Sequence, residues 1–100
     1  MRKFGKGTTQ IRVKVGDSFV LELPAAATGG YTWQLTHVPS VAVLSVERLR
    51  AAEPGAGASS IQEFEFVATR AGADILSMEY KRSWEAAAGE QLEVSIVVEL

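Results

Sequence analysis

The sequence predicts an all-β fold, built as an antiparallel sandwich of about seven to eight strands. Two observations predict this fold. First, apolar and polar residues alternate with a period of two along most of the 100 residues, as they do in strands that bury one face. Second, turn-forming residues separate the alternating segments at regular intervals, and no long helical period competes. With 47% hydrophobic and 22% charged residues, the chain is apolar enough to fold around a core.

Four strands are expected in the first half of the chain, at residues 10–15, 18–23, 31–36 and 41–50. Gly16 and Asp17 form a turn between the first two strands. Pro24 is expected to end the second strand, because proline has no N–H to donate to a neighbouring strand. The fourth segment tolerates either strand or helix, and its valines favour a strand.

Three more strands are expected in the second half, at residues 63–68, 76–80 and 92–100. A loop of small residues around Pro54 and Gly55 precedes the first of them, and a second loop at 82–90 precedes the last. This number and spacing of strands are typical of an immunoglobulin-like sandwich, and residues 1–100 are expected to form a single domain. The residues expected inside are Phe19, Leu21, Trp33, Phe64, Phe66, Leu76, Met78, Leu92, Val94 and Ile96.

Composition excludes several classes of function. The net charge is −2 and no basic stripe is visible, so no nucleic-acid partner is expected. The absence of cysteine excludes disulfides, thiolate metal sites and cysteine catalysis. No apolar run reaches the length of a membrane span. The segment Met1–Lys6 is basic without an apolar stretch behind it, so the location is expected to be cytoplasmic if Met1 is the native start. It is periplasmic or secreted if a leader has been removed.

The sequence also lacks the residue clusters that catalysis requires. His37 is the only histidine and is expected to be an exposed turn residue. Glu63 and Glu65 are two positions apart, which places them on the solvated outer face of one strand. The glycine-rich loops lack the lysine and the following helix that phosphate binding requires. We therefore expect no catalytic residue, metal site or cofactor, and a binding module is favoured over an enzyme.

Three expected loops have the composition of a protein-recognition surface. They are Thr28-Gly29-Gly30-Tyr31-Thr32-Trp33, Gly55-Ala56-Gly57-Ala58 and Arg82-Ser83-Trp84. Aromatic, arginine and glycine residues are typical of protein-binding surfaces. The loops separate alternate strands, so in a sandwich they gather at one end.

In these loops the chain resembles the chagasin-like inhibitors of papain-family cysteine peptidases. Those proteins carry three motifs in the same order: Asn-Pro-Thr-Thr-Gly followed by an aromatic residue, any residue and Trp; Gly-x-Gly-Gly; and Arg-Pro-Trp. The first motif falls on residues 26–33, where Thr28, Gly30, Tyr31 and Trp33 match. The second falls on residues 55–58 with its last glycine changed, and the third on residues 82–84 with Ser83 in place of proline.

The resemblance implies a reversible, non-covalent inhibitor that fills the active-site cleft of a papain-like cysteine peptidase with three loops. It implies an immunoglobulin-like sandwich and no enzymatic activity, and we expect a monomer. The contact residues that it implies are Ala27, Thr28, Gly29, Gly30, Tyr31, Gly55, Ala56, Gly57, Ala58, Arg82 and Trp84.

Some of these residues also have ordinary structural interpretations. Trp33 lies on the alternating face of a strand and is interpreted as the core tryptophan rather than a contact. Tyr31 suits either the edge of the core or the interface. Trp84 lies outside any alternating segment, which favours the interface over packing on its own loop. Arg82 suits a strand-end charge or a brace between loops. The glycine loop at residues 55–58 suits either a contact or a flexible connection.

The departures from the motifs leave a second function open. Ala26 and Ala27 stand where the family has Asn-Pro, and Ser83 stands where it has proline. These changes loosen the loops and raise the ordering cost of binding by about 0.5–1 kcal/mol at each site. The alternative is therefore a non-inhibitory immunoglobulin-like module that binds another protein.

Overall fold

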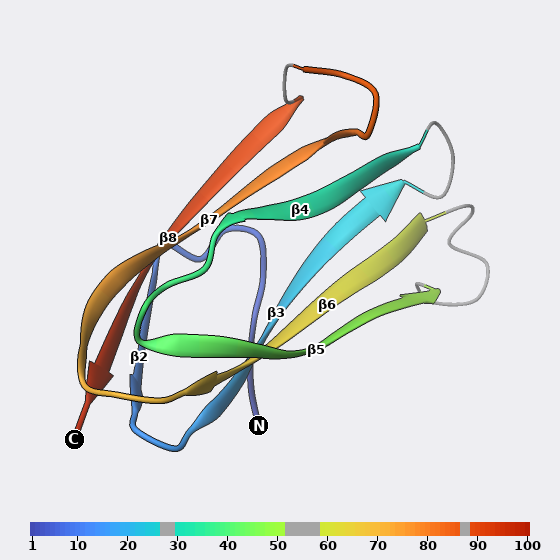
Figure 1. Ribbon diagram of the computed structural model, residues 1–100. Coiled ribbons are helices and arrows are strands. Elements are labelled where there is room, and N and C mark those ends of the chain that lie inside the picture. Colours follow the sequence, from blue (N-terminus) through green and yellow to red (C-terminus); the bar gives the residue numbers. More distant parts are fainter. Residues whose placement is uncertain (27–29, 52–58, 87–88) are drawn as a thin grey trace.

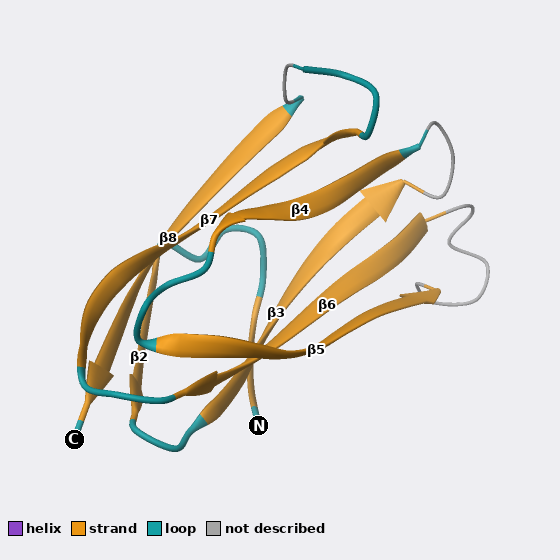
Figure 2. Ribbon diagram, viewed as in Figure 1, coloured by secondary structure: helices purple, strands orange, loops and turns teal. Residues whose placement is uncertain are grey.

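The computed structural model describes residues 1–26, 30–51, 59–86 and 89–100. They form eight strands, namely β1 (Arg2–Phe4), β2 (Gln10–Lys14), β3 (Ser18–Ala26), β4 (Tyr31–His37), β5 (Ala42–Ala51), β6 (Ser59–Ala68), β7 (Gly72–Arg82) and β8 (Glu90–Glu99). The strands lie in two four-stranded sheets, in the orders β1-β3-β6-β5 and β2-β8-β7-β4 (Figure 1). No described residue belongs to a helix (Figure 2). The predicted all-β sandwich is confirmed, and the ambiguous segment is a strand, β5.

The core lies between the two sheets and consists of their inward-facing residues. Phe19 of β3 and Phe66 of β6 stack at 5.4 Å between ring centroids, within one sheet. Trp33 of β4, only 2% exposed, contributes the largest side chain of the other sheet. All residues expected inside are buried except Leu92, which is half-buried and packs against the core. Within the described part of the chain no helix is long and apolar enough to cross a membrane.

Two strand pairings depart from the antiparallel prediction. β1 pairs with β3 in parallel, and β2 pairs with β8 in parallel. The strand β1 was itself not predicted, because three residues are too short to show a period. The N-terminal segment therefore supplies one edge strand to each sheet. Periodicity reports which face of a strand is buried and carries no information on the direction of its partner.

The prediction that Pro24 ends its strand is wrong. β3 continues to Ala26, and Pro24 lies opposite Ile61 of β6. On its other side β3 pairs with β1 only from Phe19 to Leu21. Beyond Leu21 this side of β3 is an open edge, where a missing N–H costs no strand hydrogen bond.

The expected exposure of the two glutamates of β6 is also wrong. Glu63 and Glu65 do lie on the outer face, opposite to the buried phenylalanines of the same strand. Arginines from the neighbouring strand β5 cover them, however. Arg50 Nε lies 3.3 Å from Glu63 Oε2, and Arg48 Nη1 lies 3.7 Å from Glu65 Oε1. Glu63 is consequently buried. His37 is exposed as expected, although it ends β4 rather than forming a turn.

The strands adjoining the three motif-bearing segments meet at one end of the sandwich. β3, β5 and β7 end there, and β4, β6 and β8 begin there, away from both termini (Figure 1). The strand register agrees, because Ala26 pairs with Ser59 and Tyr31 with Arg82. We call this the loop end of the molecule.

Candidate functional site

The loop end holds four of the expected contact residues within the described part of the chain. Gly30 directly precedes β4 and Tyr31 begins it, while Arg82 ends β7 and Trp84 lies in the turn that follows. Tyr31 pairs directly with Arg82 across the two strands. The other expected contact residues, Ala27, Thr28, Gly29, Gly55, Ala56, Gly57 and Ala58, lie outside the described residues.

Trp84 is the most exposed aromatic residue of the described chain. Its side chain follows Arg82 in a turn that the hydrogen bond from Glu85 N to Arg82 O closes at 3.1 Å. The residue is 70% exposed. An exposed tryptophan on a turn contributes little to the core and offers a large apolar area to a partner. This exposure accords with the interface interpretation of Trp84.

The ring of Trp84 nevertheless contacts the backbone of Gly30. A Cβ atom built on Gly30 would lie 2.8 Å from Cη2 and 3.3 Å from Cζ3 of the ring. A side chain at position 30 would therefore displace the ring from this place. Gly30 also has φ of +77°, in the left-handed region that favours glycine. The described ends of the first and third motifs therefore touch.

Arg82 lies between two of the aromatic rings. Its Cζ atom is 4.6 Å from the ring centroid of Tyr31 and 5.8 Å from that of Trp84. Its Nε also lies 3.5 Å from Oε1 of Glu85. A guanidinium between aromatic faces is attracted to both rings and restricts them. Arg82 thus braces the loop end, which is one of its two expected roles.

A column of aromatic rings connects the loop end to the core. The rings of Tyr31 and Tyr80 stack at 5.3 Å, and those of Tyr80 and Trp33 lie 4.9 Å apart. A hydrogen bond to β3 fixes the ring of Trp33, because its Nε1 donates to the carbonyl of Pro24 at 3.0 Å. Tyr31 is half-buried in this column, so it belongs to the core edge and still reaches the surface. Packing in the core therefore fixes the base of the candidate surface.

Sequence reasoning missed one residue of this support, Gln62 of β6. Its side chain is buried and reaches across to the other sheet. Trp33 N donates to Gln62 Oε1 at 2.7 Å, and Gln62 Nε2 donates to Trp33 O at 3.2 Å. The signal was present, because Gln62 shares the inward parity of Phe64 and Phe66. A polar residue at a core-facing position needs internal hydrogen-bond partners.

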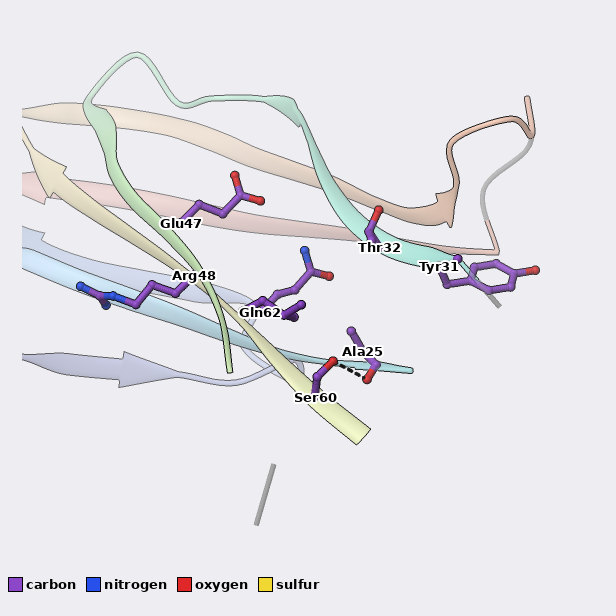
Figure 3. Close-up of a pocket in the computed structure, with 9 residues that line it drawn as sticks. Ala25, Tyr31, Thr32, Glu47, Arg48, Ser60 and Gln62 are labelled. Carbon is purple, nitrogen blue, oxygen red and sulfur yellow. Dashed lines mark hydrogen bonds between the residues drawn. The ribbon is translucent and has the colours of Figure 1, made fainter. Parts of the chain in front are cut away.

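An open pocket of about 600 Å³ lies beside the loop end, between the edges of β4 and β5. Tyr31 and Thr32 line one side, and Ser60 and Gln62 line another, with Ser60 Oγ donating to the carbonyl of Ala25 (Figure 3). Glu47 and Arg48 of β5 complete the polar part of its lining. Among the described residues, no group of histidine, aspartate and glutamate is placed to hold a metal ion.

The chain matches a known family over most of its length. Residues 12–98 match the family described as chagasin family peptidase inhibitor I42. Comparison with curated protein sequences finds no match. Solved structures with a similar fold include the three that follow. The cysteine protease inhibitor EhICP2 from Entamoeba histolytica has a TM-score of 0.86 at 19% identity, covering 98% of this chain and 95% of that one.

The other two structures are more distant in sequence. The solution structure of Amebosin has a TM-score of 0.79 at 17% identity, with 98% of this chain and 97% of that chain covered. PbICP-C, solved in complex with falcipain-2, has a TM-score of 0.70 at 13% identity, with 99% and 100% covered. At these identities the structures support the shared fold, whereas the sequence match supports the family. The chain therefore belongs to the chagasin family of peptidase inhibitors.

Proposed function

We propose that this chain is a reversible, non-covalent inhibitor of papain-like cysteine peptidases that acts by occluding the active-site cleft. The observation that carries the proposal is the placement of Trp84. It is 70% exposed, yet it packs on Gly30 and lies near Arg82 at the loop end. An exposed aromatic side chain that neighbouring residues hold in place is typical of the residues that dominate binding at a protein interface. Family membership supplies the class of partner.

The contact surface that we propose combines three segments. It comprises residues 27–31, residues 55–58, and Arg82 with Trp84. Glycine and alanine dominate the first two segments, so they can bring main-chain N–H and C=O groups close to a cleft wall. Trp84 adds apolar contact area, and Arg82 adds a planar set of donors. Occlusion of this kind requires no nucleophile on the inhibitor.

Inhibition assays on papain test the proposal directly. We expect inhibition that dilution reverses and that rising substrate concentration relieves, as a competitive mode requires. We also expect this chain to bind papain whose catalytic thiol has been blocked with a small alkylating group. Inhibition that persists after dilution, or binding that requires the free thiol, contradicts a non-covalent mechanism.

One observation favours a second candidate, a non-inhibitory protein-binding module. Ala26 and Ala27 occupy the positions at which the family carries Asn-Pro. Proline restricts φ and asparagine forms local hydrogen bonds, so both changes loosen the first loop. The two candidates differ in one measurement. A correctly folded chain that inhibits no papain-like peptidase at micromolar concentration favours the second.

A further inference from the structure

We propose that Gly30 is a positioning residue for Trp84, and that the contact between them joins the described ends of the first and third loop motifs into one preformed surface. The inference deepens the proposed function and rests on it. Gly30 acts through its lack of a side chain and through its backbone conformation. Trp84 is the residue that meets the peptidase. The proposal thus assigns a role to a residue that presents no side chain to the partner.

The first step of the argument is steric. The ring atoms Cη2 and Cζ3 of Trp84 occupy the space that a Cβ on Gly30 would need, at 2.8 and 3.3 Å. Contacts below 3.0 Å force a displacement, and here the displaced group is the end of a tryptophan ring. Even the smallest substitution, Gly30→Ala, must therefore move Trp84 or the start of β4.

The second step is the position of the two residues in the fold. Gly30 directly precedes β4, and Tyr31 pairs with Arg82 at the end of β7. Trp84 follows Arg82 by two residues, in the turn that Glu85 N closes on Arg82 O. The turn directs the ring back over the neighbouring strand. Arg82 then holds it from the side, with its guanidinium between Tyr31 and Trp84.

The third step is energetic. A tryptophan on a free turn samples several rotamers, and binding must restrict it to one. Packing against Gly30 restricts the ring before the partner arrives, while most of its surface stays exposed. The conformational entropy of the Trp84 side chain is then lost during folding rather than on binding. The backbone of Gly30, in the first motif, is the surface on which the ring packs. The motif therefore requires glycine at position 30, even though the residues before it differ from those of the family.

The experiment is a double-mutant cycle on inhibition of papain with Gly30→Ala, Trp84→Ala and the double variant. We expect each single variant to weaken inhibition by about tenfold or more. The loss of inhibition in the double variant should be clearly smaller than the sum of the two single losses, because Gly30 acts chiefly through the ring. Additive losses overturn the proposal, as does Gly30→Ala with unchanged inhibition.

Gly16→Ala is the matched control. Gly16 also has a positive φ, +92°, but an added Cβ there meets no atom within 4 Å. It lies in the turn between β2 and β3, which Figure 1 shows at the end of the molecule opposite to the loop end. Its substitution strains the backbone without displacing a ring. We expect Gly16→Ala to lower stability and leave inhibition unchanged. An equal loss of inhibition in both alanine variants attributes the effect to strain and overturns the proposal.

A second measurement keeps this proposal separate from the proposed function. In NMR spectra of the free protein, the ring current of Trp84 should shift the α-proton signals of Gly30, and Trp84→Ala should remove the shift. Absence of the shift shows that the ring does not lie on Gly30, and it overturns the proposal even if the chain inhibits papain. A clear shift in a chain that inhibits no peptidase supports the positioning of Trp84 and refutes the inhibitory function.

Discussion

The side chain of Gln62 holds the main chain of Trp33 through two hydrogen bonds that cross from one sheet to the other. Trp33 N donates to Oε1 at 2.7 Å, and Nε2 donates to Trp33 O at 3.2 Å. β4 is an edge strand, so its outward main-chain groups have no neighbouring strand to pair with. Gln62 serves as that partner for one residue. The contact links the core of one sheet to the strand on which the candidate site begins.

We therefore predict that Gln62→Leu lowers the free energy of unfolding by about 2–4 kcal/mol, because it leaves the buried N–H and C=O of Trp33 without partners. Gln91→Leu, at an exposed position of β8, is the control and should change stability by less than about 0.5 kcal/mol. Denaturant unfolding measures both. Equal effects of the two substitutions contradict a specific role for Gln62.

The two tryptophans should separate stability from inhibition. Trp33 is buried, and Trp33→Ala should cost about 3–5 kcal/mol of stability, enough to unfold much of the protein. Trp84 is largely exposed, and Trp84→Ala should cost less than about 1 kcal/mol while weakening inhibition by about 2 kcal/mol. Unfolding curves and inhibition constants for both variants provide the comparison. A destabilised Trp84→Ala that inhibits normally reverses these assignments.

The outer face of the β1-β3-β6-β5 sheet carries an ion-pair network centred on Arg50. Its guanidinium lies 2.7 Å from Glu22 Oε2 and 3.3 Å from Glu63 Oε2, linking three strands. Hydrogen bonding to Arg50 is the main cause that lowers the pKa of Glu22. A carboxyl group with a lowered pKa stabilises the fold above its ordinary pKa, and this contribution is lost as the pH falls through the folded pKa.

Arg50→Met should accordingly raise the pKa of Glu22 and lower stability at neutral pH. Arg12→Met removes an exposed pair with Glu99, whose closest atoms are 3.7 Å apart, and should have a smaller effect. NMR titration of the Glu22 carboxyl group and denaturant unfolding at pH 7 report the two quantities. An unchanged Glu22 titration in Arg50→Met shows that Arg50 is not its partner in solution.

Asp74 ties the connection between β4 and β5 to the start of β7. Its Oδ2 accepts a hydrogen bond from Ser40 N at 2.6 Å and lies 3.3 Å from His37 Nε2, while Oδ1 accepts from Ile75 N at 2.8 Å. The hydrogen bond from Ser40, followed by that from Ile75, holds the pKa of Asp74 well below its ordinary value. The unfolded chain therefore binds more protons than the folded chain in mildly acidic solution.

This difference predicts acid sensitivity. The contribution of Asp74 to stability should be complete above about pH 5 and should decline as the pH falls below the ordinary carboxyl pKa of about 4. Asp74→Asn should lower stability at pH 7 and flatten the decline between about pH 4 and pH 2. Unfolding measured across this range tests it, with the exposed Glu93→Gln as control. A variant that loses stability in acid as steeply as the parent refutes the role of Asp74.

Much of the fold could be predicted from the sequence, because the period-two pattern indicates which side chains of each strand are buried. The inward positions of Phe64, Phe66 and Trp33 were predicted for this reason. The strand β1 and its parallel pairing were not, because pairing depends on a partner distant in the chain. The contact of Trp84 with Gly30 could not be predicted from the sequence for the same reason. The motif spacing indicated the loop end, but only the register of Tyr31 with Arg82 brings the described parts of two motifs together.

The turn after β7 predicts that proline can be restored at position 83. Ser83 is the second residue of a turn that begins at Arg82 and closes with the hydrogen bond from Glu85 N to Arg82 O. Proline is favoured at this position of a β-turn because its φ is already fixed there. The third residue, Trp84, does not have a positive φ, which accords with a type I turn. Arg82 lies at the end of a strand, where the extended conformation that a following proline requires is already present.

Ser83→Pro should therefore raise stability by about 0.4–1 kcal/mol, because it removes freedom from the unfolded chain and from the turn. It should also tighten inhibition slightly, since Trp84 then loses less freedom on binding. Denaturant unfolding and the papain inhibition constant measure the two effects. Ser95→Pro is the contrasting variant, because Ser95 N donates to Thr9 O at 3.0 Å between β8 and the segment before β2. It should be strongly destabilising. A destabilised Ser83→Pro shows that the turn has a different geometry in solution, and that the third loop is not preformed in the way that the contact between Gly30 and Trp84 requires.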